Sequence, residues 1–136
     1  MRLTSTDLIV STYIMVSREE AMVRQYPAAC GLGIALAAIS GKWKATILWE
    51  LHSRPVRFGE LRRRIPGISE KVLFEQLRAM EADGLIRRDV YDEVPSRVEY
   101  TVTPAGASLN ATVHALAEWG LEHVSDIRVM VTADGR

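Results

Sequence analysis

The chain has 136 residues, of which 48% are hydrophobic and 25% are charged, and its formal net charge at pH 7 is zero. These values are typical of one globular domain with a single hydrophobic core, and they exclude a disordered or fibrous chain. An apolar run over residues 8–16 is too short to span a bilayer, and the single cysteine, Cys30, excludes an intrachain disulfide. We therefore expect a cytoplasmic protein with no membrane partner.

Three parts follow one another along the chain. Residues 1–27 carry no clear pattern, and we expect an N-terminal arm that is partly helical or loosely ordered. Residues 28–125 have the hydrophobic periodicity of a folded domain, and residues 126–136 form a C-terminal tail. All candidate functional residues lie in the middle part.

Four helices are expected in the first half of this domain. Apolar residues at helical spacing predict helices over residues 33–40 and 42–53, and a short third helix over residues 58–65. Pro66-Gly67 predicts a turn after the third helix. Ser69 then stands where the N-cap of a fourth helix belongs.

The pattern changes after Gly84, which closes the fourth helix as a C-terminal glycine. β-branched and aromatic residues predict two strands, over residues 85–91 and 98–103, joined by a polar loop that contains Pro95. This is a β-hairpin with a long tip. Pro104 then stands at the first position of a last helix, where proline is tolerated.

The order of these elements predicts a mainly α protein with a small β-hairpin wing, which is a winged helix-turn-helix. In this fold the fourth helix is narrow enough to enter a major groove of DNA, and the short helix before it crosses the phosphate backbone. The tip of the hairpin reaches a neighbouring groove or its phosphates. The expected partner is therefore double-stranded DNA.

The charge is distributed unevenly, in a way that suits this partner. Between Arg54 and Arg88 there are nine basic and five acidic residues, a net charge of +4, while the rest of the chain carries −4. A solvated charged face would produce the same counts, so the positions of the charges matter more than their number. The candidate DNA-contacting residues are Arg57, Arg62, Arg63, Arg64, Ser69, Lys71, Phe74, Glu75, Gln76, Arg78, Ser96 and Arg97.

Several of these side chains have distinct expected roles. Gln76 can pair with an adenine edge, and lysine or arginine can bind guanine or phosphate. Phe74 either contacts a thymine methyl group or is buried against a neighbouring helix. Arg97 is the single cation at the wing tip, and the acids Asp92 and Glu93 beside it oppose an approach to DNA.

A series of short motifs runs from Cys30 to Gly120. The motifs are Cys30 before a helix, Gly41-Lys42-Trp43, Arg57-Phe58-Gly59-Glu60-Leu61, Ile65-Pro66-Gly67-Ile68-Ser69, Leu77 with Glu81-Ala82-Asp83-Gly84-Leu85-Ile86, Pro95 with Val98-Glu99-Tyr100, Thr103-Pro104 with Gly106, and Glu118-Trp119-Gly120. In their order and spacing they resemble the HxlR-type regulators, which are relatives of the MarR group. The chain departs from that pattern at Phe74, where a small or hydroxyl residue is usual, and in its longer N-terminal arm.

The resemblance implies a homodimer that binds an inverted-repeat operator, with terminal helices forming the dimer interface. An apolar stripe on the last helix, with Trp119 beside it, supplies the candidate interface residues, which are Leu109, Val113, Leu116, Trp119 and Val124. The resemblance also implies that some members sense electrophiles or oxidants through the cysteine matching Cys30. Cys30 lies at the start of a predicted helix, where a thiolate is stabilised, and a buried inert cysteine is the alternative.

Other functions remain as alternatives. An enzyme is disfavoured because the three histidines lack partners at metal-ligand spacing, and because the sequence has no glycine-rich phosphate loop or nucleophile elbow. We expect no metal and no cofactor. A winged helix can also serve protein contacts alone, without binding DNA. Trp43, Trp49 and Trp119 suggest a third alternative, an aromatic-lined pocket at the dimer interface that binds a small-molecule effector.

Overall fold

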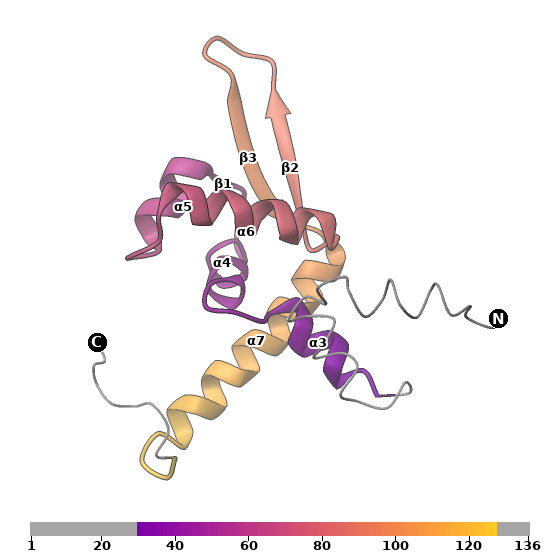
Figure 1. Cartoon of the computed structure of the whole chain (residues 1–136), viewed down its shortest axis with the longest axis vertical. Helices are drawn as coiled ribbons and strands as arrows, with labels where there is room; N and C mark the ends of the chain where they lie inside the picture. The colour runs from indigo at the N-terminus through magenta and orange to yellow at the C-terminus, as the bar shows by residue number, and fades with distance from the viewer. Residues whose placement is uncertain (1–29, 128–136) are drawn as a thin grey trace, which may run out of the picture. The chain divides into compact units, whose positions relative to one another are not determined.

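The computed structural model describes residues 30–127, which form five helices and three strands (Figure 1). The helices are α3 (Leu32–Ala38), α4 (Lys44–Glu50), α5 (Phe58–Arg64), α6 (Glu70–Ala82) and α7 (Pro104–Glu122). The strands are β1 (Val56–Arg57), β2 (Ile86–Tyr91) and β3 (Arg97–Val102). None of the described helices is both long enough and apolar enough to cross a membrane. The expected N-terminal arm and most of the expected C-terminal tail lie outside the described residues.

The chain divides between Gly41 and Lys42 into two units. The first unit contains α3, which begins directly after Gly31 and has no side-chain cap. At the end of α3 the Ser40 hydroxyl donates a hydrogen bond to the carbonyl oxygen of Ala37 at 3.0 Å. Every other described element belongs to the second unit, which also holds the candidate DNA-contacting residues.

The core of the second unit lies between α4, α5, α6 and the inner face of the sheet. Each of these helices repeats an apolar residue every three or four positions, so its apolar side chains share one face and bury it. The largest fully buried side chains are Ile47, Leu48, Leu51, Val56, Leu61, Ile65, Leu73, Leu77, Met80 and Ile86. The exposed faces of the same helices are left for function.

The three strands form an antiparallel sheet in the order β1-β3-β2. Val56 of β1 and Arg88 of β2 both pair with Tyr100 of β3, one from each side. Strands β2 and β3 continue beyond the helices as a wing (Figure 1). The hairpin is confirmed, but the sequence predicts no third strand, and β1 corrects that prediction. A strand of two residues is too short to show the alternating pattern by which strands are recognised.

Both predicted ends of α6 are confirmed. The Ser69 hydroxyl accepts a hydrogen bond from the backbone N–H of Val72 at 3.1 Å, which caps the start of the helix. At the other end Gly84 has a φ of +79°, a conformation that favours glycine. The N–H of Leu85 then donates to the carbonyl oxygen of Met80 at 3.0 Å. These bonds set the direction in which the chain leaves α6 and enters the wing.

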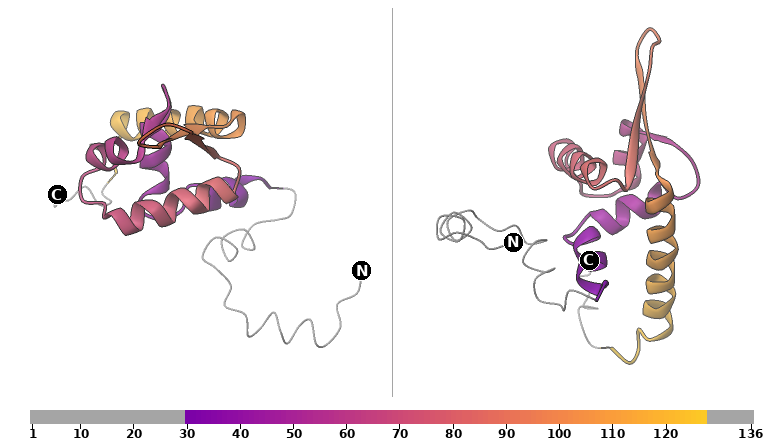
Figure 2. Two further views of the ribbon diagram at one scale, coloured as in Figure 1. Left: turned by 90° about the horizontal axis from the view of Figure 1, so that it is seen from above. Right: turned by 90° about the vertical axis from the view of Figure 1, so that its right-hand side faces the viewer.

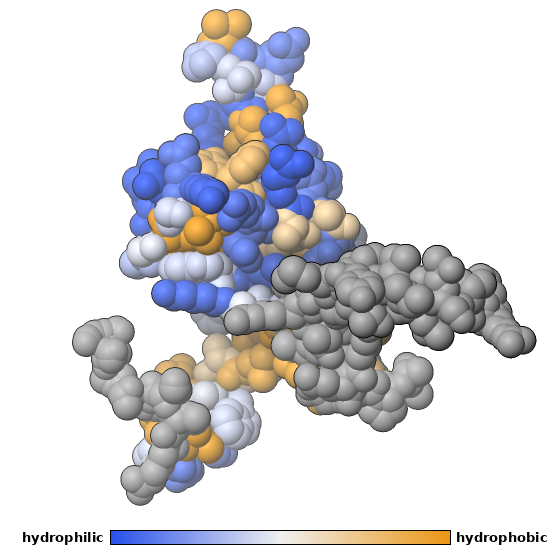
Figure 3. All heavy atoms as spheres, viewed as in Figure 1, coloured by the Kyte–Doolittle hydropathy of each residue, from blue (hydrophilic) through white to orange (hydrophobic). Residues whose placement is uncertain are grey.

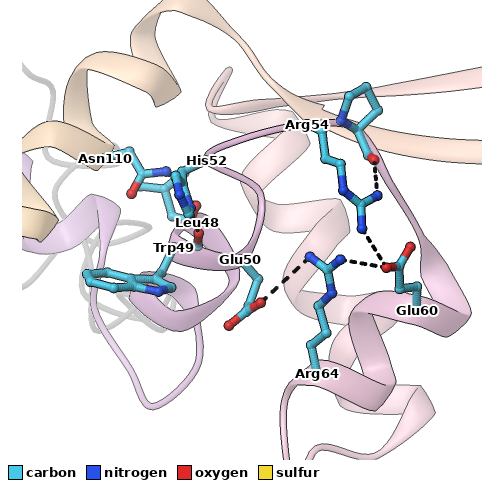
Figure 4. A network of polar contacts seen from close by, with 9 residues as sticks. Leu48, Trp49, Glu50, His52, Arg54, Glu60, Arg64 and Asn110 are labelled. Atoms are coloured by element: carbon cyan, nitrogen blue, oxygen red, sulfur yellow. Dashed lines mark hydrogen bonds and ion pairs between the residues drawn. The ribbon is translucent and has the colours of Figure 1, made fainter.

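Thr103 connects the start of α7 to the end of α6. Its hydroxyl accepts a hydrogen bond from the first turn of α7 at 3.1 Å and donates to the carbonyl oxygen of Gly84 at 2.6 Å. Pro104 occupies the first turn, as predicted. Further along, the buried Asn110 Nδ2 donates to the carbonyl oxygen of Leu48 at 2.6 Å and ties α7 to α4 (Figure 4). Helix α7 then extends away from the wing (Figures 1 and 2).

Candidate nucleic-acid interface

Helices α5 and α6 are joined by a short turn, and α6 lies next to the wing on the outside of the second unit (Figure 2). Gly67 in the turn has a φ of +86°, which a residue with a side chain rarely adopts. Ile65 and Ile68 on either side of it are buried and hold the turn against the core. Two helices joined in this way, with a β-hairpin directly after the second, form a winged helix-turn-helix.

The exposed face of α6 carries four of the predicted DNA-contacting residues. Lys71, Phe74, Glu75 and Arg78 are exposed, and helical spacing puts them on one side of α6. Lys71 Nζ lies 3.9 Å from Glu75 Oε2, and the Arg78 guanidinium lies 5.7 Å from the centre of the Phe74 ring. Gln76 is partly buried and lies on the flank of α6 that is remote from Phe74. The structure therefore brings Gln76 to the edge of this surface and not to its centre.

Ion pairing divides the arginines of the described residues into two groups. The arginines that pair with a carboxylate are Arg54, Arg62, Arg64, Arg87 and Arg97. The arginines that form no ion pair within residues 30–127 are Arg57, Arg63, Arg78 and Arg88. A guanidinium without a carboxylate partner keeps its full attraction for an anion, so the second group is better suited to phosphate.

Arg64 lies in a network that joins α4 to α5 (Figure 4). Its guanidinium is 2.5 Å from Glu60 Oε2 and 3.8 Å from Glu50 Oε1. Arg54 donates a second hydrogen bond to the same oxygen of Glu60 at 2.8 Å. This bond from Arg54, together with the charges of Arg54 and Arg64, holds the pKa of Glu60 below its usual value. Of the predicted phosphate contacts on α5, Arg64 is thus the one that pairs with two carboxylates inside the protein.

The other two arginines of α5 are more accessible. Arg63 is exposed, and Arg62 lies 3.6 Å from Glu70 at the start of α6, with both side chains largely exposed. An exposed ion pair contributes little to stability, so Arg62 can exchange Glu70 for a phosphate at small cost. A hollow of about 400 Å³ lies beside these side chains. Its lining residues are Phe58, Gly59, Arg62, Arg63, Ile65, Pro66, Gly67, Ile68 and Glu70.

Arg97 is held within the wing by two carboxylates. It donates to Glu93 at 2.8 Å and to Glu99 at 2.7 Å, and its guanidinium lies 3.8 Å from the centre of the Tyr91 ring. The bonds to Glu93 and Glu99 raise the pKa of Arg97 further above its usual value, and the bond from Arg97 lowers the pKa of Glu93. The side chain of Arg97 is 23% exposed, and the two carboxylates neutralise its positive charge. Ser96 beside it is exposed.

Two further predicted DNA-contacting residues, Arg57 and Ser69, are exposed. Arg57 is exposed and pairs in register with Glu99, on the face of the sheet opposite to that of Tyr100. Ser69 is exposed at the first turn of α6, where its hydroxyl already caps the helix. Because the start of a helix favours negative charge, Ser69 is well placed to meet a phosphate.

Arg88 of β2 is not among the DNA-contacting residues predicted from the sequence, where it counts only toward the charge of the region. Arg88 is exposed, and it lines a hollow between α6 and the sheet together with Phe74 and Tyr100. Successive residues of a strand point to opposite faces, so the apolar Ile86 indicates that Arg88 shares its face of β2. That signal was available in the sequence, but the presence of α6 beside this face was not.

The candidate dimer residues of α7 divide into buried and exposed ones. Val113 is 7% exposed and belongs to the core of the protomer, and Leu109 is half-buried. The exposed large hydrophobic residues in the second half of α7 and just after it are Leu116, Trp119, Leu121, Val124 and Ile127. The predicted set lacks Leu121 and Ile127. Figure 3 shows hydrophobic residues at the surface along α7.

Aromatic rings stack in pairs on the surface of α4 and α7. Trp49 of α4 lies on His114 of α7 with ring centres 3.9 Å apart, and His52 meets His114 edge-on at 5.0 Å. Near the end of α7, Trp119 stacks on His123 at 4.5 Å. Within residues 30–127, no three side chains of the metal-binding types are grouped so as to hold an ion.

Comparison with known proteins agrees with this geometry. Residues 38–128 match the HxlR-like helix-turn-helix family. The chain is 46% identical over 91 residues to a helix-turn-helix transcriptional regulator of Methanothermobacter thermautotrophicus, and the match covers 67% of this chain and 70% of the relative. Among solved structures it is similar to the redox regulator HypR in its oxidized form, with a TM-score of 0.64, 40% identity and coverage of 68% of this chain and 96% of HypR. It is also similar to a MarR-family transcriptional regulator from Enterococcus faecalis, with a TM-score of 0.67, 40% identity and coverage of 74% and 91%.

The family match includes α4 to α7 and the whole wing, and it confirms the winged-helix fold and the HxlR-type assignment made from the motifs. The chain belongs to the HxlR-like helix-turn-helix family of transcriptional regulators.

Proposed function

We propose that this regulator is a homodimer that binds double-stranded DNA at an inverted-repeat operator, and that it has no enzymatic activity. The observation that carries the proposal is the exposed face of α6, which presents Lys71, Phe74, Glu75 and Arg78 beside a wing. Direct readout of bases needs polar side chains on an element narrow enough for the major groove, with cations nearby to bind the backbone. The second unit has both.

Each exposed side chain of α6 suits a particular edge of a base pair. Lys71 and Arg78 can donate to guanine or to a phosphate, and Glu75 can accept from the amino group of cytosine. The half-exposed ring of Phe74 can contact a thymine methyl group. Gln76 can reach an adenine at the edge of the surface. Phosphate contacts from Arg62, Arg63 and Ser69 would fix the register of α6 on the duplex.

The proposal of a dimer is supported by the large apolar side chains that are exposed in the second half of α7 and just after it. Large apolar side chains that gather on one surface mark an association site, and a two-fold dimer uses the same surface of both subunits. A two-fold dimer presents its two α6 helices to successive major grooves, so the half-site centres should lie about 10–11 base pairs apart or a whole-turn multiple of that spacing.

The test is a footprint on the DNA upstream of the protein's own gene, with random-sequence DNA as competitor. We expect a protected segment with two-fold symmetry that survives an excess of random DNA. If each subunit makes three or four phosphate contacts, log K falls with log salt with a slope of about −5 to −7. A winged helix that serves protein contacts alone would shift no DNA even at low salt. Equal affinity for the upstream DNA and for random DNA would contradict sequence-specific binding.

We further propose control of DNA binding through Cys30. Cys30 is exposed, it is the single cysteine of the chain, and the similar protein HypR is a redox regulator. It lies outside residues 38–128, so the family match by itself assigns it no role. An oxidant that accepts two electrons would join two Cys30 thiols of a dimer, or one thiol and a small thiol, in a disulfide. The alternative control is a small-molecule effector that binds between the subunits against the exposed Trp49 and Trp119.

A further inference from the structure

A groove runs between α6 and the wing. It consists of two adjoining hollows, of about 290 and 330 Å³, that share Phe74 of α6, Arg88 of β2 and Tyr100 of β3. Arg78 of α6 lines the second hollow. We call this feature the helix–wing groove. The wing residues from which DNA contacts are predicted, Ser96 and Arg97, line neither hollow.

Strand register explains why Arg88 reaches this groove and its neighbour does not. Arg88 pairs with Tyr100, and both side chains face α6. Arg87 points to the other face of the wing, where its Nε lies 2.9 Å from Asp89 Oδ1. Two consecutive arginines of one strand therefore differ in surroundings, since one is held by a carboxylate and the other faces the groove.

The charges around the groove leave it attractive to an anion. Arg78 and Arg88 form no ion pair within the described residues, whereas the carboxylate of Glu70 in the first hollow lies 3.6 Å from Arg62. Glu81, which lines the second hollow, is the only other carboxylate in the lining of the two hollows. It forms no ion pair with a described residue. Aromatic rings beside a guanidinium exclude water, which strengthens its attraction for an anion.

The position of the groove identifies the anion. A B-DNA major groove is bordered by two phosphate backbones, so a helix lying in it has one backbone on each side. In the proposed complex Arg62 and Arg63 of α5 contact one of these two phosphate backbones. The other must pass the side of α6 that carries the wing, where an arginine can bind a phosphate through two parallel N–H donors. We propose that the helix–wing groove binds a phosphodiester of the operator backbone through Arg88 and Arg78.

This proposal rests on the proposed function and refines it. It places the phosphate contact of the wing at its base, on Arg88, and not at its tip. Arg97 at the tip is neutralised by Glu93 and Glu99, so it has little charge to offer a phosphate. The wing tip would then contribute to DNA binding through its shape and not through electrostatic attraction to phosphate.

The experiment measures binding of the full-length protein to its operator and to random DNA over a range of salt concentrations. The variants are Arg88→Ala and, as the matched control on the opposite face of the same strand, Arg87→Ala. For a dimer we expect Arg88→Ala to weaken both DNAs by a similar factor, roughly ten- to thirtyfold, and to make the salt slope less steep by about 2. Arg87→Ala should leave affinity and slope close to wild type.

Three further variants sharpen the result. Arg88→Lys keeps the charge, so it should restore the salt slope but not the full affinity, because lysine cannot bind a phosphate bidentately. It also covers the case in which Arg88→Ala fails to fold. Glu81→Gln should tighten binding to both DNAs, because it removes a carboxylate that repels the phosphate. Arg97→Ala should change affinity less than Arg88→Ala.

The outcomes separate this proposal from the proposed function. If the wild type binds no DNA, the proposed function fails and this inference with it. If the wild type binds its operator but Arg88→Ala and Arg87→Ala behave alike, DNA binding stands and the groove assignment is overturned. Inorganic phosphate at matched ionic strength should displace DNA no better than chloride. Selective displacement that Arg88→Ala leaves unchanged would place the phosphate-sensitive contact outside the groove and would count against the assignment.

Discussion

Gly106 near the start of α7 packs so closely on Leu85 that a Cβ atom at Gly106 would lie 2.0 Å from the carbonyl oxygen of Leu85. The same oxygen accepts a hydrogen bond from the N–H of Thr103 at 3.1 Å. Leu85 lies between α6 and β2, so the contact joins α7 directly to the segment that connects α6 to the wing. The placement of α6 relative to α7 therefore depends on glycine at this position.

We expect Gly106→Ala to destabilise the protein by about 3 kcal/mol, because a Cβ cannot fit against backbone atoms unless α7 shifts. Urea denaturation followed by circular dichroism measures the change in the free energy of unfolding. The matched control is Gly120→Ala, also in α7, where no described atom lies within 4 Å of the added Cβ. That variant should be more stable than wild type by about 0.5–1 kcal/mol, the usual difference between alanine and glycine inside a helix. Equal effects of the two variants would mean that the contact with Leu85 is unimportant.

The second prediction concerns which residue of α6 reads a base. We expect Glu75→Ala to relax specificity at one base position by about 1–3 kcal/mol, because Glu75 lies on the exposed face of the helix. Gln76→Ala should change specificity less, because its side chain is partly buried on the far flank. Binding to a set of operators with single base changes measures both effects. A larger loss for Gln76→Ala, confined to an adenine position, would place Gln76 at the centre of readout.

The third prediction is a dimer that forms through α7. Sedimentation at micromolar concentration should give twice the chain mass for the wild type. Trp119→Glu combined with Leu121→Glu should give a monomer, because two charges cannot be buried in an apolar interface. Val94→Glu at the wing tip is the control, since Val94 is fully exposed in the loop between β2 and β3 and does not belong to α7. A wild type that sediments as a monomer would contradict the proposal.

The fourth prediction is a dependence of stability on pH that comes from Glu60. Its pKa is lowered from 4.5 in the folded protein, first by the hydrogen bond from Arg54, so it stabilises the fold when ionised. The contribution is present above the ordinary pKa and disappears as the pH falls through the lower, folded value. The stability advantage of wild type over Glu60→Gln should therefore shrink as the pH is lowered below about 4.5.

Urea midpoints measured between pH 7 and pH 3 check this dependence. In the background of Arg54→Met the loss of stability caused by Glu60→Gln should be smaller at pH 7, because the larger cause of the pKa shift is gone and Arg64 alone remains. In the wild-type background, a loss of stability caused by Glu60→Gln that stays constant down to pH 3 would contradict this prediction. It would mean that the two arginines do not stabilise the ionised form of Glu60 in the folded protein.

The last prediction concerns Cys30. Diamide or a quinone should change operator binding by the wild type but not by Cys30→Ser, because the chain has no other thiol to oxidise. The assay compares both proteins with and without the oxidant, and a reductant added afterwards should restore the wild type. A non-reducing gel shows whether the disulfide joins two chains. If oxidant releases both proteins from DNA equally, or neither, Cys30 is not the sensor.

The elements of the DNA-binding region could be predicted because each carries a local signal. Ser69 and Gly84 marked the two ends of α6, since a capping hydroxyl and a left-handed glycine act within one turn of the helix. The apolar spacing of α6 then identified its solvent-facing side, and with it the positions of Lys71 and Arg78. Strand β1 could not be predicted, because a strand of two residues is too short to show an alternating pattern.

The sequence by itself determined the order of the helices and the wing, the ends of α6 and the family, because all of these depend on neighbours a few residues apart or on motif spacing. Tertiary structure alone decided which arginines are available to DNA. Arg64 meets Glu60 one turn back on its own helix, but also Glu50 of α4, and Arg97 meets Glu99 on its own strand and Glu93 across the wing tip. Arg88 meets no carboxylate among the described residues and faces α6. Spacing along the chain allows the local pairs, but whether an arginine meets a carboxylate of another element depends on distances of a few ångströms, and no local pattern in the chain records those distances.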